Sequence, residues 1–419
     1  MVVPAADEAA NVAELAERIR EVLTKSADAY ELIVVVPTPE DRTGAVAEAN
    51  GARVIVQRRP GYGGALKEGL QAARGDYVVT MDADLSHPPE KIADLLQHRD
   101  EAEVVVCSRY APGASSGTGI GRRLLSWVLN AVYGRLLALP VKDSSSGFRI
   151  YQRHVLDEVE LQGEKYDVLQ ELLVKVYCRG YTLREIPFDY MPRAAGASHA
   201  QPFRWAPHFA TTLLRLFKVR NHFEAADYDS RAYDTINVPQ RYWQRKRFAI
   251  VEDMAGDGGR RLDVGCGSSR IIQTHPEAVG IDLCLPKLRF LRRTNPKLLR
   301  ASTFDLPIAT ASMDVLVHSQ VIEHIPYERK LFTEMNRVLK LGGKLVIGTP
   351  DYGRVQWRTI EALYKILMPN GYGDDHITHY TRQRLIEELA QAGFGIQRYA
   401  YILGGELVVE AVKREHVAS

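Results

Sequence analysis

The chain has 419 residues, of which 46% are hydrophobic and 25% charged, and its formal net charge is +2. This length is too great for one hydrophobic core, so two domains are expected. The near-zero net charge argues against bulk nucleic-acid binding, so no nucleic-acid partner is expected. The 4 cysteines lack paired or metal-type spacing, which predicts free thiols in a reducing compartment.

Two stretches of the first half bear on membrane contact. The apolar stretch 124–141 contains Asn130 and Arg135, with Gly134 in mid-run, so a membrane span is not expected there. The stretch 207–220 mixes apolar and basic residues, which predicts a helix that lies either in the headgroup plane or against a sheet. The chain opens on a predicted strand without a signal peptide, so we expect a cytoplasmic protein, soluble or peripheral on the cytoplasmic membrane face.

Apolar runs typical of strands alternate with helical patterns along the first half. Strands are expected at 1–4, 32–36, 54–56 and 77–81, and helices around 15–23, at 43–50, up to 73 and at 90–99. Strands that alternate with helices imply right-handed crossovers and a mostly parallel sheet. The first half is therefore predicted to be an α/β domain.

Two carboxylates follow the strand 77–81 directly. Asp82 and Asp84 have one residue between them, so a period of two is expected to turn them the same way at the strand's carboxyl end. Open α/β sheets hold ligands at that end, and Mg²⁺ is held by one or two carboxylates plus substrate phosphates. The basic, glycine-rich loop 58–64 also suits phosphates. The pattern predicts a metal-bridged nucleotide diphosphate; the alternative is a pair of solvated acids and a plain turn.

Several short motifs follow one another in the first 220 residues. They are Val3-Pro-Ala-Ala-Asp-Glu8, Gly61-Tyr-Gly-Gly-Ala65, Met81-Asp-Ala-Asp-Leu-Ser-His-Pro-Pro-Glu90, Ser108-Arg-Tyr110, Asp143-Ser-Ser-Ser-Gly-Phe-Arg149, Glu185-Ile-Pro187 and Arg193-Ala-Ala-Gly-Ala-Ser198. In this combination the chain resembles glycosyltransferase family 2, and within it the dolichol- or polyprenyl-phosphate sugar transferases. The resemblance implies a nucleotide-sugar fold of the GT-A type, a nucleotide-sugar donor, inversion at the sugar carbon and a lipid-phosphate acceptor that needs no general base.

The resemblance also implies roles for particular residues. Asp84, with Asp82 beside it, would hold Mg²⁺ or Mn²⁺ on the diphosphate. The residues implied at the donor nucleotide are Glu8, Asp41 and Gly63. The arginines implied to hold the two phosphate-bearing substrates are Arg109, Arg193 and either Arg122 or Arg123. Arginine's planar fork suits phosphate oxygens, and the alternative for each of these arginines is a surface salt bridge.

The chain departs from the family pattern after the second strand. Where the family usually has Asp-Asp-Gly-Ser, this sequence has Val36-Pro-Thr-Pro-Glu-Asp41. Three explanations stay open: Glu40 or Asp41 compensates for the missing acid, the donor is unusual, or the transferase is weak or inactive. A second departure is Ala197-Ser-His199, where the family often has Glu-Ser-Lys.

The second half starts after a change of pattern at 221–234, where acids, Tyr and Asn gather and the domain boundary is expected. A strand at 262–264 leads into a tight turn at Gly265-Cys-Gly267, where the glycines allow a ligand to lie against the backbone. The next strand ends at Asp282, 17 positions beyond the first of these glycines, and an acid there suits a ribose hydroxyl pair. A nicotinamide site would prefer a third glycine, and Arg270 stands in its place.

A second ordered set of motifs runs through the rest of the chain. It consists of Leu262-Asp-Val-Gly-Cys-Gly267, Gly280-Ile-Asp282, Thr303-Phe-Asp-Leu-Pro307, Ser312-Met-Asp-Val-Leu-Val317, Val321-Ile-Glu-His-Ile325, Glu334-Met-Asn-Arg-Val-Leu-Lys-Leu-Gly-Gly-Lys344, Leu345-Val-Ile-Gly-Thr-Pro350, His379-Tyr-Thr381 and Ala392-Gly-Phe394. This order resembles the class I S-adenosylmethionine-dependent methyltransferases over residues 225–415.

This second resemblance implies a cofactor, S-adenosylmethionine, and a set of residues around it. Implied contacts are Asp263, Gly265 and Gly267 at the methionine end, Asp282 at the ribose, Asp305 at the adenine amine, and Gln320 and Glu323 on the far wall. A hydroxyl acceptor usually needs a base with a pKa near neutral, and histidine is the natural type. The candidate bases are His324, His376 and His379, each of which is otherwise a structural or surface histidine.

The sequence therefore predicts two Rossmann-like α/β domains: a GT-A type glycosyltransferase at 1–222 and a class I methyltransferase at 223–419. We expect a bifunctional, metal-dependent enzyme that transfers a sugar to a polyprenyl phosphate or glycan and a methyl group to a glycan, lipid or small molecule. The rival hypothesis is a methyltransferase whose degenerate glycosyltransferase half binds the acceptor or targets a membrane. A non-enzymatic scaffold is the third, disfavoured by retention of both sets of acidic strand ends.

Overall fold

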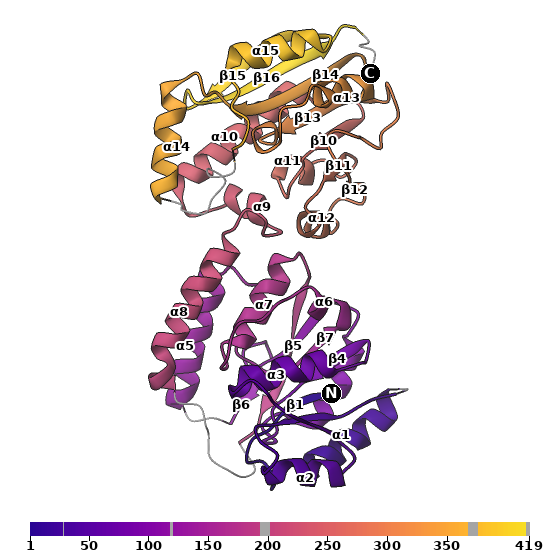
Figure 1. The fold of residues 1–419 in the computed structure, drawn as a ribbon, viewed down its shortest axis with the longest axis vertical. Coiled ribbons are helices and arrows are strands. Elements are labelled where there is room, and N and C mark those ends of the chain that lie inside the picture. The colour runs from indigo at the N-terminus through magenta and orange to yellow at the C-terminus, as the bar shows by residue number, and fades with distance from the viewer. Residues whose placement is uncertain (28, 118–119, 193–201, 368–375, 416–419) are drawn as a thin grey trace. The chain divides into compact units, whose positions relative to one another are not determined.

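The computed structural model describes residues 1–27, 29–117, 120–192, 202–367 and 376–415. The chain divides into two compact units, Met1–Arg220 and Asn221–Ser419. Figure 1 colours the first unit from indigo to rose and the second from rose to yellow.

A seven-stranded sheet in the order β3-β2-β1-β4-β7-β5-β8 forms the centre of the first unit, with a separate pair β6-β9. The strands are β1 Val2–Pro4, β2 Ile33–Val36, β3 Arg53–Val56, β4 Tyr77–Thr80, β5 Val104–Ser108, β6 Ser115–Ser116, β7 Arg149–Gln152, β8 Leu183–Pro187 and β9 Asp189–Tyr190. The helices are α1 Val12–Ser26, α2 Arg42–Ala49, α3 Gly61–Ala72, η1 Pro89–Lys91, α4 Ile92–Gln97, α5 Ile120–Leu136, α6 Arg153–Asp157, α7 Val168–Cys178 and α8 Pro202–Arg220. The sheet is mostly parallel, and β7 runs antiparallel to both β4 and β5.

Both faces of this sheet are buried, which is why its strands are continuous apolar runs. Along β2 the side chains alternate: Ile33 and Val35 belong to one core cluster, and Val34 and Val36 to the other. The face of α1 that packs on the sheet is apolar at helical spacing, as its sequence predicted, and Leu15, Ile19 and Leu23 are buried. The parallel part of the sheet therefore directs the ends of β1, β2 and β4 to one edge.

The helices α5 and α8 pack against each other in the first unit (Figure 1). The Tyr133 hydroxyl on α5 donates to the Phe209 carbonyl oxygen on α8 at 2.7 Å. Arg220 at the end of α8 is buried and donates through Nε to the Leu137 carbonyl oxygen at 2.7 Å. Within the described part of the chain, none of the helices has the combination of length and apolar character that crossing a membrane requires. These contacts of α8 are thus with α5 and the residue that follows it, and packing of this stretch on a sheet or in the headgroup plane stays a prediction.

The second unit is built on a seven-stranded sheet in the order β12-β11-β10-β13-β14-β16-β15. Its strands are β10 Arg261–Val264, β11 Val279–Asp282, β12 Leu298–Arg300, β13 Met313–Ser319, β14 Leu339–Pro350, β15 Phe394–Ile402 and β16 Glu406–Lys413. Its helices are α9 Tyr228–Tyr233, α10 Val238–Ala255, α11 Arg270–Gln273, α12 Leu285–Leu291, η2 Ile322–His324, α13 Arg329–Val338, α14 Val355–Leu367 and α15 Arg382–Gln391. The strands β10 to β14 are parallel, and β16 is antiparallel to β14 and β15.

Candidate active sites

In the first unit, the two acids after β4 have different environments. Asp84 is only 2% exposed, and its Oδ1 accepts hydrogen bonds from the Ser86 amide at 3.0 Å and the Ser86 hydroxyl at 2.5 Å. Asp82 is partly exposed, and its Oδ1 lies 3.3 Å from the Tyr62 hydroxyl that donates to it. The strand itself ends at Thr80, so the strict alternation expected for these acids does not extend through the turn.

His87, to which no sequence motif assigned a role, holds this turn in place. His87 is buried and stacks on Phe148, with ring centroids 5.1 Å apart. Its Nδ1 accepts from the Asp82 amide at 3.1 Å, so the proton of the neutral ring is on Nε2, 3.8 Å from Asp82 Oδ2. Burial lowers the pKa of His87, against the charges of Asp82 and Asp84. The ring therefore acts as a neutral support beneath the acids.

Two further acids lie at the neighbouring strand ends. Glu8 follows β1, is buried, and accepts a hydrogen bond from Asn11 Nδ2 at 2.6 Å. Asp41 follows β2 and caps α2 through the Thr43 amide at 2.9 Å, while its Oδ2 accepts from the Asp7 amide at 3.0 Å. Burial opposes ionisation of Asp41, but these hydrogen bonds outweigh it and lower its pKa. Because β1, β2 and β4 are adjacent and parallel, both acids share a sheet edge with Asp82 and Asp84.

The glycine-rich loop is explained by close packing within the fold. A Cβ on Gly63 would lie 2.4 Å from the Gly163 carbonyl oxygen, and one on Gly64 would lie 2.0 Å from the Arg59 carbonyl oxygen. The glycines therefore let the start of α3 approach the backbone at 163–164 closely. Binding of a donor nucleotide at Gly63 stays a prediction.

Of the predicted phosphate-binding arginines, Arg109 has a well-defined partner inside the fold. It binds the buried Asp143 through two contacts of 2.8 Å, from Nε and Nη2, and Nη2 also donates to Ser145 Oγ at 2.7 Å. Burial opposes ionisation of Asp143, and the Arg109 guanidinium outweighs it and lowers that pKa. Arg123 is an exposed residue of α5. Arg193, like His199 and the side chain of Arg122, lies outside the described residues.

In the second unit, the turn after β10 is a tight cradle. Gly265 has φ +73°, and a Cβ there would lie 2.3 Å from Val321 Cγ2. Gly267 has φ +53°, and its amide donates to Asp282 Oδ2 at 2.7 Å. The other oxygen of Asp282 accepts from the Cys284 amide at 2.7 Å. Glycine is required at both turn positions, and the acid at the end of β11 is locked beside them.

Asp263, next to this turn, is a buried carboxylate that the fold does not fully satisfy. It is 3% exposed, and its Oδ2 has no hydrogen-bond partner among the described residues. Burial raises its pKa to about 7; Asp282 and Glu252 add to this rise, and Arg261 opposes it. Such an atom suits a cationic or hydrogen-bonding group of a ligand.

The same turn is held by a residue from the segment 221–234, where the domain boundary was predicted. Asp229 Oδ2, on α9, accepts from the Ser268 amide at 3.0 Å and from Lys287 Nζ at 2.8 Å. A Cβ on Gly267 would lie 2.6 Å from the same oxygen. The acids gathered at 221–234 were the only sign in the sequence that this segment has a role in the site. The partners of Asp229, Ser268 and Lys287, are distant in the sequence, so the contact could not be predicted.

The predicted adenine and far-wall residues differ in burial. Asp305 has a side chain that is 76% exposed and pairs with Lys330 Nζ at 2.6 Å. Gln320 has φ +61°, and its Nε2 is buried without a partner among the described residues. Glu323 is buried, its Oε2 accepting from Thr349 Oγ1 at 3.2 Å. Burial raises the pKa of Glu323 to about 8, the nearby acid Glu406 adding to this effect.

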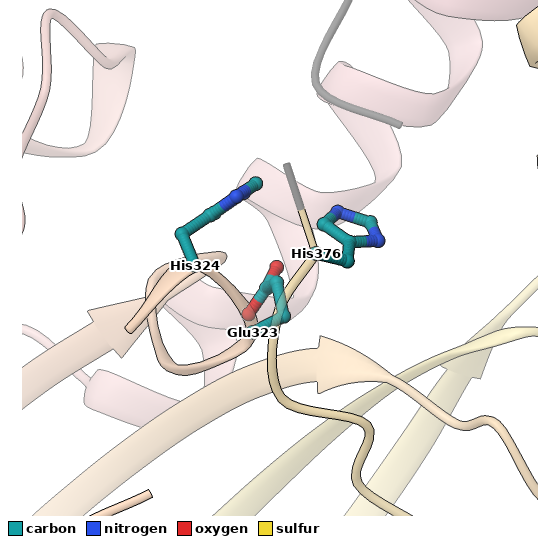
Figure 2. A group of neighbouring side chains, drawn as sticks. All are labelled: Glu323, His324 and His376. Atoms are coloured by element: carbon teal, nitrogen blue, oxygen red, sulfur yellow. The ribbon is translucent and has the colours of Figure 1, made fainter. Parts of the chain in front are cut away.

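Two of the three candidate histidines lie together. His324 and His376 have ring centroids 4.8 Å apart, and Glu323 lies between them in Figure 2. His379 is exposed and stacks on Tyr352 at 4.0 Å. The structure therefore brings His324 and His376 to the end of β13 and leaves His379 at the surface.

Comparison with known proteins identifies both units. Residues 1–160 match the family model Glycosyl transferase family 2, and residues 262–347 match the family model Methyltransferase domain. These matches define a chain with two transferase domains. The chain belongs to glycosyl transferase family 2 and carries a methyltransferase domain in its second half. Both resemblances and the predicted fold class are confirmed.

Individual relatives match one unit at a time. The chain is 32% identical over 194 residues to the dolichyl-phosphate hexose transferase of Haloferax volcanii. This alignment covers 44% of this chain and 80% of that protein. It is 32% identical over 210 residues to the dolichol-phosphate mannosyltransferase of Pyrococcus furiosus, covering 47% of this chain and only 58% of that relative's length. A solved SAM-dependent methyltransferase of Thermotoga maritima, a possible histamine N-methyltransferase, aligns with TM-score 0.35 and 19% identity over 44% of this chain and 99% of that one.

Proposed function

We propose that the chain is a bifunctional enzyme, a sugar transferase in its first unit and a methyltransferase in its second. The observation that carries the proposal is that each of two family-matched units gathers acids at the carboxyl ends of neighbouring parallel strands. Open α/β sheets bind ligands at that edge. Two such edges in one chain support two separate ligand sites.

In the first unit, the carboxylates after β4 suit a Mg²⁺ or Mn²⁺ ion on a nucleotide-sugar diphosphate. Hard divalent ions prefer carboxylate oxygens and phosphates, and Asp82 and Asp84 supply such oxygens. Glu8 and Asp41 stand at the adjacent strand ends, where a nucleoside would lie. The hydrogen bonds of Asp41 to Asp7 and Thr43 support the view that it compensates for the acid missing after β2.

The acceptor proposed for this unit is a polyprenyl phosphate, in keeping with the two relatives named for dolichol-phosphate chemistry. A phosphate monoester is already ionised near neutral pH, so its oxygen can attack the sugar carbon without a general base, with inversion. A surface of the first unit supports contact with a membrane: α5 exposes an apolar stripe at helical spacing. Its members are Leu124, Val128, Val132 and Leu136, with Trp127 beside them.

In the second unit, the residues present fit S-adenosylmethionine. The orphaned Asp263 Oδ2 lies beside the turn at Gly265, where the backbone allows close approach, and Asp282 stands at the end of the next strand. When bound, the cofactor supplies an electrophilic methyl group. His324 and His376 stand on the β13 side of that site, and their proposed role is to promote loss of the acceptor's proton.

Incubation of the pure protein with a nucleotide sugar, polyprenyl phosphate and isotope-labelled S-adenosylmethionine tests the proposal. A lipid product that carries both the sugar and the label is expected if the two units act in sequence on one glycolipid. Methyl label absent from every sugar-containing product would contradict the coupling. Sugar transfer absent with methylation retained would instead favour the rival hypothesis of a first unit that only binds or targets.

The departure from the family pattern at Pro37-Thr38 favours the rival hypothesis, in which the first unit is not a sugar transferase. A binding assay distinguishes this hypothesis from the bifunctional enzyme. UDP- and GDP-sugars with Mn²⁺ are expected to raise the melting temperature of the first unit, since a ligand that binds only the folded state stabilises it. No shift with any nucleotide sugar would indicate that the first unit has lost its donor site.

A further inference from the structure

Three metal-ligating side chains from separate parts of the second unit converge at the end of β13. Glu323 and His324 belong to η2, and His376 comes from the segment before α15. Figure 2 shows the three side chains together. One potential ligand atom from each lies within 4.8 Å of the others. The backbone fastens the two segments together, since the amides of Ile377 and Thr378 donate to the Glu323 carbonyl oxygen at 2.8 and 3.1 Å.

Glu323 brings an unsatisfied oxygen to this cluster. The residue is 0% exposed, and Thr349 occupies only Oε2. Its Oε1 has no hydrogen-bond partner among the described residues. A buried carboxylate oxygen without a partner is costly, and a bound cation would satisfy it.

A hydrogen bond to Tyr352 orients the ring of His376, as is usual for a histidine that binds a metal. Its Nδ1 lies 2.7 Å from the Tyr352 hydroxyl, which itself donates to Glu361 Oε1 at 3.2 Å. Tyr352 has one hydroxyl hydrogen, so Nδ1 is the donor in the first contact and the lone pair of the ring is on Nε2. In histidines that bind a metal, the N–H of the other ring nitrogen typically donates a hydrogen bond to a nearby oxygen. This contact fixes the tautomer and the ring orientation.

We propose that Glu323, His324 and His376 form a binding site for a divalent first-row transition-metal ion. Two imidazoles and one carboxylate suit Zn²⁺, Mn²⁺, Fe²⁺ or Ni²⁺. Ligand atoms at about 2.1 Å from an ion lie about 3–3.5 Å from one another, so the side chains close around the ion by small rotations from their present spacing. Three protein ligands leave coordination positions open.

The site lies beside the proposed cofactor turn, and its role rests on the proposed methyltransferase function. Val321, two residues before Glu323, is the side chain that a Cβ on Gly265 would meet at 2.3 Å. An acceptor hydroxyl that occupies an open position on the ion has a lowered pKa and loses its proton to solvent. Its oxygen then attacks the methyl group, forming an O–C bond as the S–C bond breaks and S-adenosylhomocysteine leaves. His324 and His376 thus act as ligands rather than as bases.

Metal titration of the full-length chain tests this site directly. The parent protein carries Asp82→Asn and Asp84→Asn, so that the proposed metal site of the first unit does not bind the added ion. A chelator removes any bound metal from this protein before the titration. Isothermal titration with Zn²⁺, Mn²⁺ and Ni²⁺, each alone, is expected to show one bound equivalent for at least one ion. His324→Ala and His376→Ala should each weaken it about 100-fold, and Tyr352→Phe about tenfold. His222→Ala, which removes a histidine that lies outside this cluster and beside Glu224, should leave the affinity unchanged.

Titration of the same proteins with S-adenosylhomocysteine separates the two proposals. Cofactor-product binding without any metal binding in the parent would overturn the metal site and leave the methyltransferase proposal standing. Metal binding that survives His376→Ala would overturn the assignment of ligands. Failure to bind S-adenosylhomocysteine would instead count against the proposed function itself. If an alanine variant fails to fold, Tyr352→Phe keeps the hydroxyl-to-histidine contact, and hence the ligand assignment, under test.

Discussion

The buried carboxylate of Asp263 predicts a pH dependence of stability that the substitution Asp263→Asn should remove. Its pKa is about 7 in the folded protein, against an ordinary value of 3.8. Between these values the folded state holds a proton that the unfolded state has released, so stability falls as pH rises through this window and levels off above 7. The shift of roughly three units corresponds to about 4 kcal/mol over the whole window, at about 1.4 kcal/mol per unit.

Urea denaturation of the full-length protein at pH 5, 6, 7 and 8 measures this effect, with the transition of the second unit followed by hydrogen exchange of β10. From pH 5 to pH 7 the wild type should lose roughly 2–3 kcal/mol of stability relative to Asp263→Asn. Asp305→Asn is the matched control, because its side chain is 76% exposed, and it should keep the wild-type slope. Equal slopes for wild type and Asp263→Asn would refute the assignment of a proton to this buried acid.

Two further predictions concern packing and charge in the second unit. Gly265→Ala should destabilise the second unit by roughly 1–3 kcal/mol and weaken S-adenosylhomocysteine binding, because the added Cβ would lie 2.3 Å from Val321. Calorimetry measures both effects. Gly258→Ala is the control, because a Cβ there would meet nothing within 4 Å. Arg247→Met should cost about 3–5 kcal/mol in urea denaturation, because it removes the charged partner of the fully buried Glu406, whose oxygens lie 2.6 and 2.8 Å from the guanidinium. The neutral Trp243 Nε1–H, which also donates to Glu406, cannot replace that charge. A loss below about 1 kcal/mol would contradict a stabilising pair.

Local patterns were enough to predict the fold class of both units. The continuous apolar run at 32–36 predicted a strand, which the structure has at Ile33–Val36, and the spacing of Leu15, Ile19 and Leu23 marked one face of α1. The acids at the strand ends and the turn at Gly265 were also predicted from these patterns, because they directly follow the predicted strands in the sequence. The strand β7 and its position between β4 and β5 were not predicted, because its pairing partners are distant from it in the sequence.

The parts of the sites that were missed depend on contacts between distant residues. Asp229 looked like a residue of a junction, yet it clamps the glycine turn through Ser268 and Lys287. The environments of Asp82 and Asp84 differ because the strand stops before them. Likewise, histidines assigned separately as bases, His324 and His376, meet only because the backbone at 377–378 pairs with Glu323.

The central claim is that this chain has two independent ligand sites, and a crossed binding experiment tests it most directly. Asp84→Asn and Asp263→Asn proteins are each titrated with a nucleoside diphosphate plus Mn²⁺ and with S-adenosylhomocysteine. The first substitution should abolish nucleotide binding and leave S-adenosylhomocysteine binding at the wild-type level, and the second should do the reverse. Loss of both ligands in either variant, or of neither in both, would contradict the assignment of one site to each unit.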